Sequence, residues 1–234
     1  MRLTYFGQSA FQLDDNDGTR ILIDPWIEGN PACDRAVESF TDITAVLVTH
    51  AAFDHLGDAP AIARQNDAPL LCDYTTRTAL MDRGFPEEQL EGYIWGAEHD
   101  GDGWSAKVVE AHHMSYDEKA NLIGPALAYI VTIDDTSVYH MGDTSIFGDI
   151  ELFADLYEPT VSLVPVGQAP GYFTELHPDE AALAAEWLNS EVVVPMHYAP
   201  GSDNPVEFQE HCKERGVNEE TDIELLSAGS TLEV

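Results

Sequence analysis

The chain has 234 residues, enough for one large domain, and its hydrophobic content of 44% is ordinary for a globular protein. Its 10 Lys+Arg against 43 Asp+Glu give a net charge of −33, which disfavours nucleic acid as a partner because that binding rests largely on phosphate neutralisation. No apolar run approaches the ~20 residues of a membrane span, so we expect a single domain over residues 1–234, with no membrane segment.

The acidic residues are spread along the whole chain rather than gathered in one tail. Such a charge destabilises a compact state by self-repulsion in dilute salt. At ~1 M salt the Debye length is only about 3 Å, and surface charges then stop repelling one another. The composition therefore resembles that of a halophilic protein with an acidic surface. An acidic face for one basic partner is less favoured, because no segment concentrates the charge.

The three cysteines, Cys33, Cys72 and Cys212, are far apart and have no paired spacing. A disulfide framework is therefore not expected, which fits a reducing cytosol. We expect a cytoplasmic protein.

The predicted elements begin with short strands and turns and continue with strands that alternate with helices. Strands are predicted over residues 2–6, 10–13, 19–24, 44–48, 69–72, 105–111, 126–133, 137–141, 160–165 and 191–195. Helices are predicted over residues 57–66, 75–83, 149–157 and 178–189. Two mixed sheets covered by helices are the simplest architecture for this pattern.

Polar side chains that could bind a metal recur just after predicted strands. His50 follows strand 44–48, and His113, Asp143 and His197 follow later strands in the same way. Loops at strand ends carry chemistry, and strand ends on a common edge would put these side chains within reach of one another. The sequence leaves open whether the edge is shared.

The segment from Thr49 to His55 is typical of a metal-binding loop. It places two imidazoles and the carboxylate of Asp54 within six residues, directly after an apolar strand. These groups can converge on a divalent cation such as zinc, which favours nitrogen and oxygen donors. The alternative is a polar helix entry in which the aspartate serves as a cap.

Together with its surroundings, this loop is part of a series that resembles the metallo-β-lactamase superfamily, and within it a family of small metal-dependent hydrolases. The resemblance covers nearly the whole chain. The matching segments are residues 3–10, 21–26 with 29–31, 49–58, 139–144 and 195–198. Several motifs in the family's order are a strong signal, whereas any one alone would be weak.

The resemblance implies an α+β fold, an αββα sandwich of two mixed β-sheets flanked by helices, with a metal site at one edge. It implies that His50 and His113 bind a first metal and that Asp143 bridges to a second. The second metal's own ligands would be Asp54, His55 and His197. The ions would be one or two of zinc or another divalent metal such as manganese.

The implied reaction is hydrolysis of an ester, lactone or phosphodiester bond in a small-molecule substrate by metal-bound hydroxide. Asp54 and Asp143 would be the catalytic carboxylates, with Asp54 both binding the metal and helping to orient the water. The sequence leaves a homo-oligomer open.

Ala52 departs from the family's pattern His-x-His-x-Asp-His, because it stands where a second histidine belongs. The first metal site should therefore be weakened but not abolished, since catalytic zinc commonly uses three protein ligands plus water. Gln8 is another departure, at a position where the family usually has His. Whether His112, His177 or Gln8 compensates stays open. The alternative is a degenerate binding or regulatory protein with one metal or none.

Asp24 follows an apolar strand and precedes Pro25. We expect its carboxylate to orient the loop that carries His50 and His55 through hydrogen bonds, rather than to bind metal. Aromatic residues near the candidate ligands either line a pocket or simply pack. These residues are Trp26, Tyr116, Tyr172, Phe173 and Tyr198.

Overall fold

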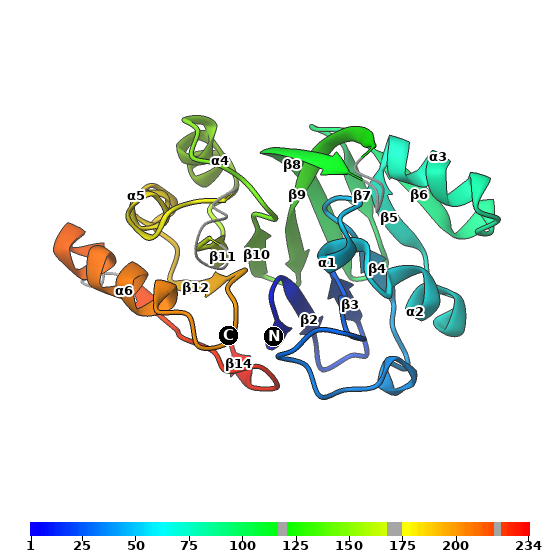
Figure 1. Ribbon diagram of the computed structural model, residues 1–234, viewed down its shortest axis with the longest axis horizontal. Coiled ribbons are helices and arrows are strands. Elements are labelled where there is room, and N and C mark those ends of the chain that lie inside the picture. Colours follow the sequence, from blue (N-terminus) through cyan, green and yellow to red (C-terminus); the bar gives the residue numbers. More distant parts are fainter. Residues whose placement is uncertain (117–120, 168–174, 218–220) are drawn as a thin grey trace.

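Two seven-stranded sheets pack face to face between two layers of helices (Figure 1). The computed structural model describes residues 1–116, 121–167, 175–217 and 221–234, apart from the side chains at positions 122 and 123. Helices α1, α2 and α3 lie on the outer side of one sheet, and α4, α5 and α6 on the outer side of the other (Figure 1). Within the described ranges, no helix is long and apolar enough to span a membrane.

The first sheet has the strand order β14-β1-β2-β3-β4-β5-β6. The pairs from β14 to β3 are antiparallel and those from β3 to β6 are parallel. Its strands are β1 (Arg2–Gly7), β2 (Ala10–Asp14), β3 (Arg20–Ile23), β4 (Ala45–Leu47), β5 (Leu70–Asp73), β6 (Leu90–Tyr93) and β14 (Thr231–Glu233). The helices between them are α1 (Phe53–Leu56), α2 (Ala59–Asn66), α3 (Tyr74–Asp82) and the 3₁₀ turns Val37–Ser39 and Glu87–Gln89.

The second sheet has the strand order β13-β12-β11-β10-β9-β8-β7. The pairs from β7 to β10 are antiparallel and those from β10 to β13 are parallel. Its strands are β7 (Glu98–Asp100), β8 (Trp104–Tyr116), β9 (Leu122–Ile133), β10 (Thr136–His140), β11 (Val161–Pro165), β12 (Val192–Met196) and β13 (Asp222–Ile223). Its helices are α4 (Asp149–Tyr157), α5 (Pro178–Leu188) and α6 (Asn204–Arg215).

The central strands are apolar on both faces because each sheet is covered twice. On β4, Leu47 packs in the core between the sheets, while its neighbours Val46 and Val48 pack beneath α2. On β9, Tyr129 belongs to the core between the sheets and Ala128 to the core beneath the helices of the second sheet. Successive side chains of a strand point to opposite faces, so an unbroken apolar run fits this double cover.

The predicted sandwich of two mixed sheets is confirmed, but several elements were not predicted. The strands that were not predicted are β6, β7, β13 and β14, and the α-helices that were not predicted are α1 and α6. The predicted helix over 57–66 is present as α2, which begins at Ala59, and the short helix α1 before it ends at Gly57, where φ is +35°. A Cβ at Gly57 would lie 2.7 Å from the Cα of Trp26, so only glycine allows this close approach.

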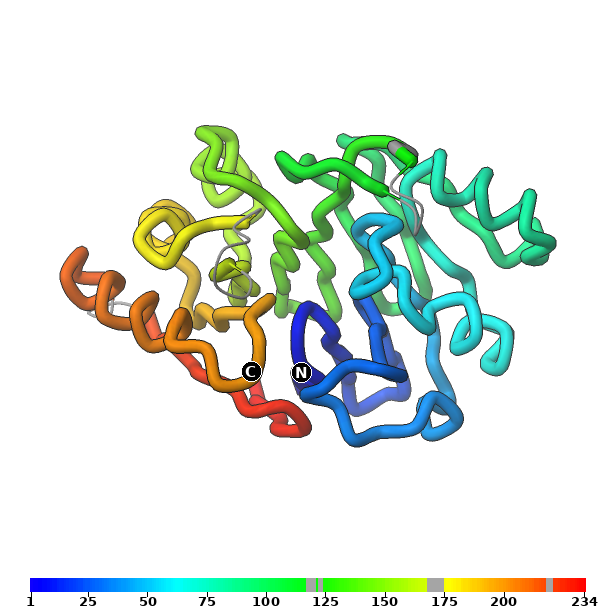
Figure 2. Tube along the Cα trace, in the orientation of Figure 1, coloured from blue at the N-terminus to red at the C-terminus, as the bar shows by residue number. Residues whose placement is uncertain are grey.

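The two ends of the chain meet in the first sheet, where β1 pairs with β14 (Figure 2). The amino group of Met1 donates to the carbonyl of Val234 at 2.7 Å. The three cysteines are free, as the sequence predicted.

Candidate metal centre

The loop that carries the first candidate ligands leaves the carboxyl end of β4 and turns at once into α1. His50 is buried in the loop, and Asp54 and His55 are buried on the first turn of the helix. Ala52 precedes the helix, and its carbonyl accepts hydrogen bonds from the backbone amides of His55 and Leu56 at 3.1 and 2.8 Å. The polar side chains therefore point into the protein although they lie in a short connection.

The carboxylate of Asp24 fixes this loop from the neighbouring strand. Its Oδ1 accepts from the amide of Thr49 at 2.8 Å, and its Oδ2 accepts from the Thr49 hydroxyl at 2.7 Å. Oδ2 also lies 2.7 Å from Nδ1 of His55, which turns the Nε2 of that ring toward the centre. The predicted orienting role of Asp24 is confirmed. A histidine held in this way presents a fixed tautomer and ring direction to a metal.

Asp143 lies after β10 and faces four histidines with its two oxygens. Its Oδ1 lies 3.2 Å from Nε2 of His55 and 3.3 Å from Nε2 of His197. Its Oδ2 lies 3.8 Å from Nε2 of His50 and 3.9 Å from Nε2 of His113. The structure thus brings together side chains from β4, β8, β10 and β12, and the edge that the sequence left open is shared.

The loop that carries Asp143 is held by a neighbouring histidine, His140. His140 Nδ1 accepts from the amide of Gly142 at 3.2 Å, so its Nε2 carries the proton and donates to the carbonyl of Ser9 at 2.9 Å. His140 therefore joins the turn between β1 and β2 to the loop of Asp143.

His113 reaches the centre from within β8 rather than from the loop after it. The predicted strand ended at residue 111, whereas β8 continues to Tyr116 with an irregular register between Glu110 and Met114. Beyond His113, the hydroxyl of Ser115 accepts from the amide of Ala51 at 2.8 Å and ties β8 to the loop of His50. A local irregularity of this kind re-aims side chains at the edge of a sheet.

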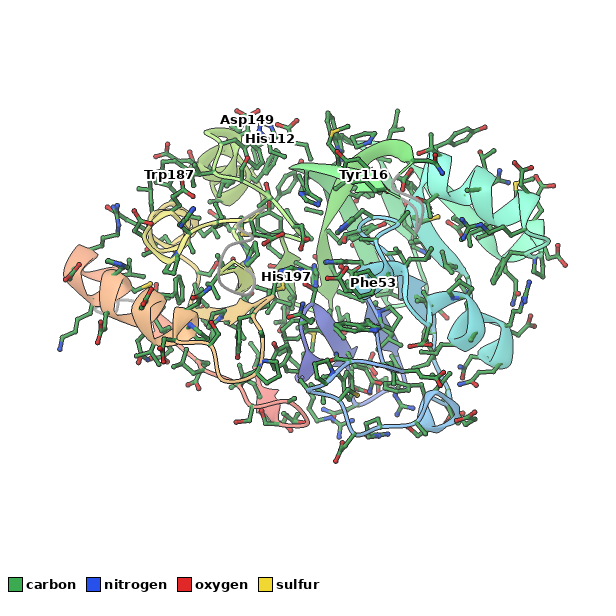
Figure 3. The ribbon with its side chains drawn as sticks, in the orientation of Figure 1. Phe53, His112, Tyr116, Asp149, Trp187 and His197 are labelled. Carbon is green, nitrogen blue, oxygen red and sulfur yellow. The ribbon has the colours of Figure 1, made fainter. Side chains whose placement is uncertain are left out.

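His197 follows β12 and completes the set. It has a φ of +58°, and its amide donates to the carbonyl of Gln8 at 2.9 Å. Its Nε2 lies 3.5 Å from Oδ2 of Asp54, and its Nδ1 lies 3.7 Å from Oε2 of Glu175. Figure 3 shows His197 in the middle of the molecule, between the two helical layers.

Glu175 is a buried acidic residue beside His197 that the sequence did not single out. It lies before α5, and groups of side chains able to hold a metal ion include Asp143, Glu175 and His197 together. The other candidate ligands were predicted because they directly follow apolar strands. No predicted strand directly precedes Glu175, so the sequence did not indicate it as a ligand.

Opposite charges inside the centre shift the ionisation of its members. Burial lowers the pKa of His50 to about 3, and the neighbouring His55 acts in the same direction. Burial alone would also lower the pKa of His55 and of His197, yet the adjacent Asp143 carboxylate raises both above the usual value. Against the effect of burial, His197 and His55 hold the pKa of Asp143 well below its usual range. Asp54, beside His197, has its pKa lowered to about 2 in spite of burial.

The side chains of the centre fit a divalent metal, because several of their buried nitrogen and oxygen atoms have no hydrogen-bond partner. Within the described ranges, buried atoms that lack a hydrogen-bond partner include Nε2 of His50, Nε2 of His55, Oδ1 of Asp143 and both ring nitrogens of His197. Each unsatisfied buried group costs about 1–3 kcal/mol. Imidazole nitrogens and carboxylate oxygens are the donors that zinc and similar ions take, so a bound cation would remove this cost.

Three residues are candidate substitutes for the histidine that the family has at position 52: His112, His177 and Gln8. His112 is 46% exposed in its side chain and stacks on Phe147 at 3.9 Å between ring centroids. Figure 3 shows His112 beside Asp149, away from His197. His177 is exposed at the start of α5, where its amide donates to the Glu180 side chain.

Gln8 contacts a candidate ligand through its backbone, because its carbonyl accepts from the amide of His197. Its Oε1 is buried without a hydrogen-bond partner in the described part of the chain.

The aromatic residues near the candidate ligands differ in their packing and exposure. Trp26 packs edge-to-face on Phe53 at 5.3 Å, and Tyr198 packs toward Tyr5 and donates to the carbonyl of Leu226. Tyr116 is 43% exposed. The other two, at positions 172 and 173, lie outside the described residues.

Comparison with known proteins finds similar chains and a matching family. Residues 19–198 match a family model described as a beta-lactamase superfamily domain. The chain is 37% identical over 238 residues to a UPF0173 metal-dependent hydrolase of Pyrococcus horikoshii, and 36% identical over 239 residues to one of Methanopyrus kandleri, with 100% of each chain covered.

A similar solved structure is Igni18, described as a novel metallo hydrolase of the archaeon Ignicoccus hospitalis. It matches with a TM-score of 0.83 and 33% identity, and the match covers 100% of this chain and 98% of that one.

Proposed function

Because this chain belongs to the beta-lactamase superfamily, we propose that it is a metal-dependent hydrolase whose active site is the centre around Asp143. The observation that carries the proposal is the division of the Asp143 carboxylate, because its two oxygens face two different pairs of histidines. A carboxylate placed in this way can bridge two metal ions. The relatives named metal-dependent hydrolases, which match over the full length, support the same conclusion.

The proposed first site consists of His50, His113 and Oδ2 of Asp143. The proposed second site consists of Asp54, His55, His197 and Oδ1 of Asp143. The second set is the better supported, because its atoms lie within 3.2 to 3.5 Å of a carboxylate oxygen, whereas His50 and His113 lie 3.8 and 3.9 Å from Oδ2. With alanine at position 52, the first site has three protein ligands, the number that catalytic zinc commonly uses. We propose one or two ions of zinc or another divalent metal such as manganese.

The protein's own groups have defined tasks in this proposal. When bound, the metal supplies a Lewis acid and a water of lowered pKa. Asp54, ionised at neutral pH because its pKa is about 2, accepts a hydrogen bond from the attacking water and orients it. Asp24 holds the ring of His55 and Asp143 holds the two sites at a fixed separation, so the groups need little rearrangement during the reaction.

The substrate we propose is a small molecule with an ester, lactone or phosphodiester bond. Nucleic acid is disfavoured because 10 Lys+Arg in a chain of net charge −33 leave little basic surface for phosphates.

The test measures metal and activity in one preparation. Wild type in molar KCl is analysed for metal by mass spectrometry and assayed with p-nitrophenyl acetate, a γ-lactone and bis(p-nitrophenyl) phosphate. We expect at least one tightly held divalent ion and activity on one of the three. Asp143→Asn should lose both, whereas Asp149→Asn, at an exposed position at the start of α4, should lose neither. A wild-type protein that holds no metal and hydrolyses none of the three would overturn the proposal.

Ala52 favours a second candidate function. Loss of a histidine at this position fits a protein that keeps the fold as a binding or regulatory module with one metal or none. Two tightly held metals in wild type would exclude this alternative.

We also propose that the acidic surface is adapted to the high salt concentration in the cytoplasm of a halophile. Six acidic residues are buried in the described part of the chain, and the other described acidic side chains are at least partly exposed; the six are Asp14, Asp24, Asp54, Asp73, Asp143 and Glu175.

A further inference from the structure

Large apolar side chains are exposed beside the candidate metal centre, in a protein whose surface is otherwise strongly acidic. Ten large hydrophobic residues are exposed in the described part of the chain, and six of them follow β4, β5 or β6 or lie at the end of β8. The six, which we call the apolar rim, are Phe53, Tyr74, Ile94, Trp95, Met114 and Tyr116. Figure 3 shows Phe53 and Tyr116 on the side of His197 where α3 and the strands of the first sheet lie.

Two members of the apolar rim are direct neighbours of proposed metal ligands. Phe53 precedes Asp54 and is 64% exposed, and Met114 follows His113 and is 40% exposed. Exposed apolar groups that are gathered in one place usually mark a binding site, whereas single ones need no explanation. The apolar rim therefore borders the candidate centre along the chain at Phe53 and Met114.

The apolar rim continues into a pocket of about 260 Å³. Its apolar lining comes from Tyr74, Tyr93, Ile94, Trp95, Pro125 and Leu127. Trp95 is fixed as a wall, because its indole nitrogen donates to the carbonyl of Ala126 at 2.9 Å. The pocket is thus formed in advance of any ligand.

The polar side chains that line the pocket, Asp73 and Thr75, are already committed. The Asp73 carboxylate accepts from the amides of Thr75 and Thr76 at 3.0 and 2.9 Å, and also from both of their hydroxyls. It therefore serves as the cap of α3. A charged or strongly polar ligand group would find no partner in these two residues, so the pocket suits a neutral apolar group.

The pocket lies next to the loops of the metal centre, and the backbone of Leu127 stands between them. The amide of Leu127 donates to the carbonyl of Thr49 at 2.9 Å, one residue before His50. A Cβ at Gly142 would lie 3.0 Å from the carbonyl oxygen of Leu127, one residue before Asp143. One wall of the pocket therefore packs directly against both loops that carry the candidate ligands.

We infer that this pocket binds the apolar acyl or alkyl part of an ester-type substrate whose scissile bond lies at the metal centre. The inference rests on the proposed hydrolase function and names the part of the substrate that the chain selects. A pocket of about 260 Å³ is smaller than the about 300–1,000 Å³ of a site that holds a whole ligand, so it takes one group while the rest of the molecule lies over the centre. The occupant is a neutral chain or ring rather than an anionic lipid surface, which a net charge of −33 would repel.

The first test varies the length of the acyl chain. With p-nitrophenyl acetate, butyrate and hexanoate in molar KCl, kcat/KM should rise about fourfold per methylene, the factor expected for moving one CH₂ out of water. Ile94→Glu places a charge at the pocket and should remove this dependence. The matched control is Val206→Glu, a similar change at a 50% exposed apolar residue on α6, which should retain it.

The second test measures binding without hydrolysis. The ketone 2-octanone carries a neutral hexyl chain and cannot be hydrolysed, and its binding to the purified protein is followed by saturation-transfer NMR. Ile94→Glu should weaken it at least tenfold and Val206→Glu should not. Binding of 2-octanone by a wild-type protein that holds no metal and hydrolyses neither p-nitrophenyl acetate, the γ-lactone nor bis(p-nitrophenyl) phosphate would support the pocket while overturning the proposed function.

Three outcomes count against the pocket. Hydrolysis that is indifferent to chain length would overturn it and leave the function standing. Failure of wild type to bind 2-octanone would overturn it as well. An Ile94→Glu variant that changes the protein from oligomer to monomer by size-exclusion chromatography, with no effect on 2-octanone, would show that the apolar rim joins copies of this chain instead.

Discussion

The buried carboxylate of Asp24 lies 2.7 Å from Nδ1 of His55, while Nε2 of the same ring lies 3.2 Å from Asp143. The imidazole is therefore held between a carboxylate from β3 and the carboxylate at the centre. A partner of this kind fixes the tautomer and direction of a ligating histidine, and its loss typically costs 10- to 100-fold in metal affinity. Substitution of Asp24 therefore measures how much an orienting carboxylate adds to metal affinity.

Asp24→Asn should weaken zinc binding by about 10- to 100-fold. Asparagine tolerates the φ of +48° at this position, so the change removes the charge with little backbone strain. Affinity is measured by competition with a chelator in molar KCl. The control is Asp134→Asn, at an exposed turn with a φ of +53°, which should bind zinc as wild type does. Equal affinity in wild type and Asp24→Asn would show that His55 needs no orienting carboxylate.

Ala52→His should strengthen the proposed first site. Position 52 lies between His50 and Asp54 in the loop, and a third imidazole would add a donor to a set of three. We expect at least a tenfold lower dissociation constant for the more weakly held ion, measured by calorimetric zinc titration. Ala61→His, on the exposed side of α2, controls for adventitious binding by a new histidine. The same gain in both variants would contradict a specific site at position 52.

Glu175→Gln should weaken the ion held by His197. The buried Glu175 carboxylate lies 3.7 Å from Nδ1 of His197, on the opposite side of the ring from Asp143. Removing its charge makes the imidazole a weaker donor, so we expect an approximately tenfold loss of zinc affinity by chelator competition. Glu191→Gln, at an exposed position, is the matched control. If both variants bind zinc equally, Glu175 has only a packing role.

The sequence predicted the sandwich because its apolar strands are short, unbroken and buried on both faces, as Val46, Leu47 and Val48 illustrate. It failed for α6, where a few apolar residues such as Phe208 stand in an acidic segment and burial is supplied by packing against α5. The apolar residues there are too few to show the helical spacing that would indicate a helix.

The candidate ligands were found by their position after strands, and the exceptions show the limits of that rule. His113 lies inside β8, and an irregular register that the sequence does not reveal turns it toward Asp143. Glu175 follows no predicted strand. The pocket unites Tyr74, Ile94 and Leu127 from separate connections and strands, and only tertiary folding brings them together.

Zinc binding should release protons near neutral pH. Without metal, the Asp143 carboxylate raises the pKa of His55 and of His197 and so favours their charged forms, whereas His50, with a pKa of about 3, is neutral. Ligating nitrogens must be deprotonated, so His55 and His197 give up their protons on binding. Calorimetry in buffers of different ionisation enthalpy measures the release. No buffer dependence at pH 7 would contradict charged rings in the metal-free state.

The same two histidines set the pH dependence of stability in the metal-free protein. Their folded-state pKa values lie above the usual 6.5, so the stability that they contribute is fully present below about pH 6.5 and is lost as the pH rises through the folded values. Thermal unfolding of chelator-treated protein from pH 7.5 to 9, at constant KCl, should show a falling Tm; below this range the lowered pKa of His50 acts with the opposite sign. A Tm that rises over this range would contradict the stabilising contribution of His55 and His197.

Salt should stabilise the protein by screening its own surface. With 43 acidic and 10 basic side chains, ion pairs such as Arg215 with Glu186 at 2.8 Å can neutralise only a small part of the charge. The Debye length falls from about 30 Å at 0.01 M to about 3 Å at 1 M, so most of the repulsion is removed within that range. Tm should rise by about 10 °C between dilute buffer and 1 M KCl, the shift expected for roughly 3–5 kcal/mol in a chain of this size.

The form of the salt curve separates screening from a general effect of cosolutes. Screening acts most steeply at the lowest salt concentrations, where the Debye length changes most. Sucrose stabilises proteins by exclusion from their surface and screens no charge, so its effect should grow gradually with concentration. We therefore expect a steep early rise in Tm with KCl and only a gradual rise with sucrose. Coincident gradual curves for both would show that the acidic surface does not limit stability in dilute buffer.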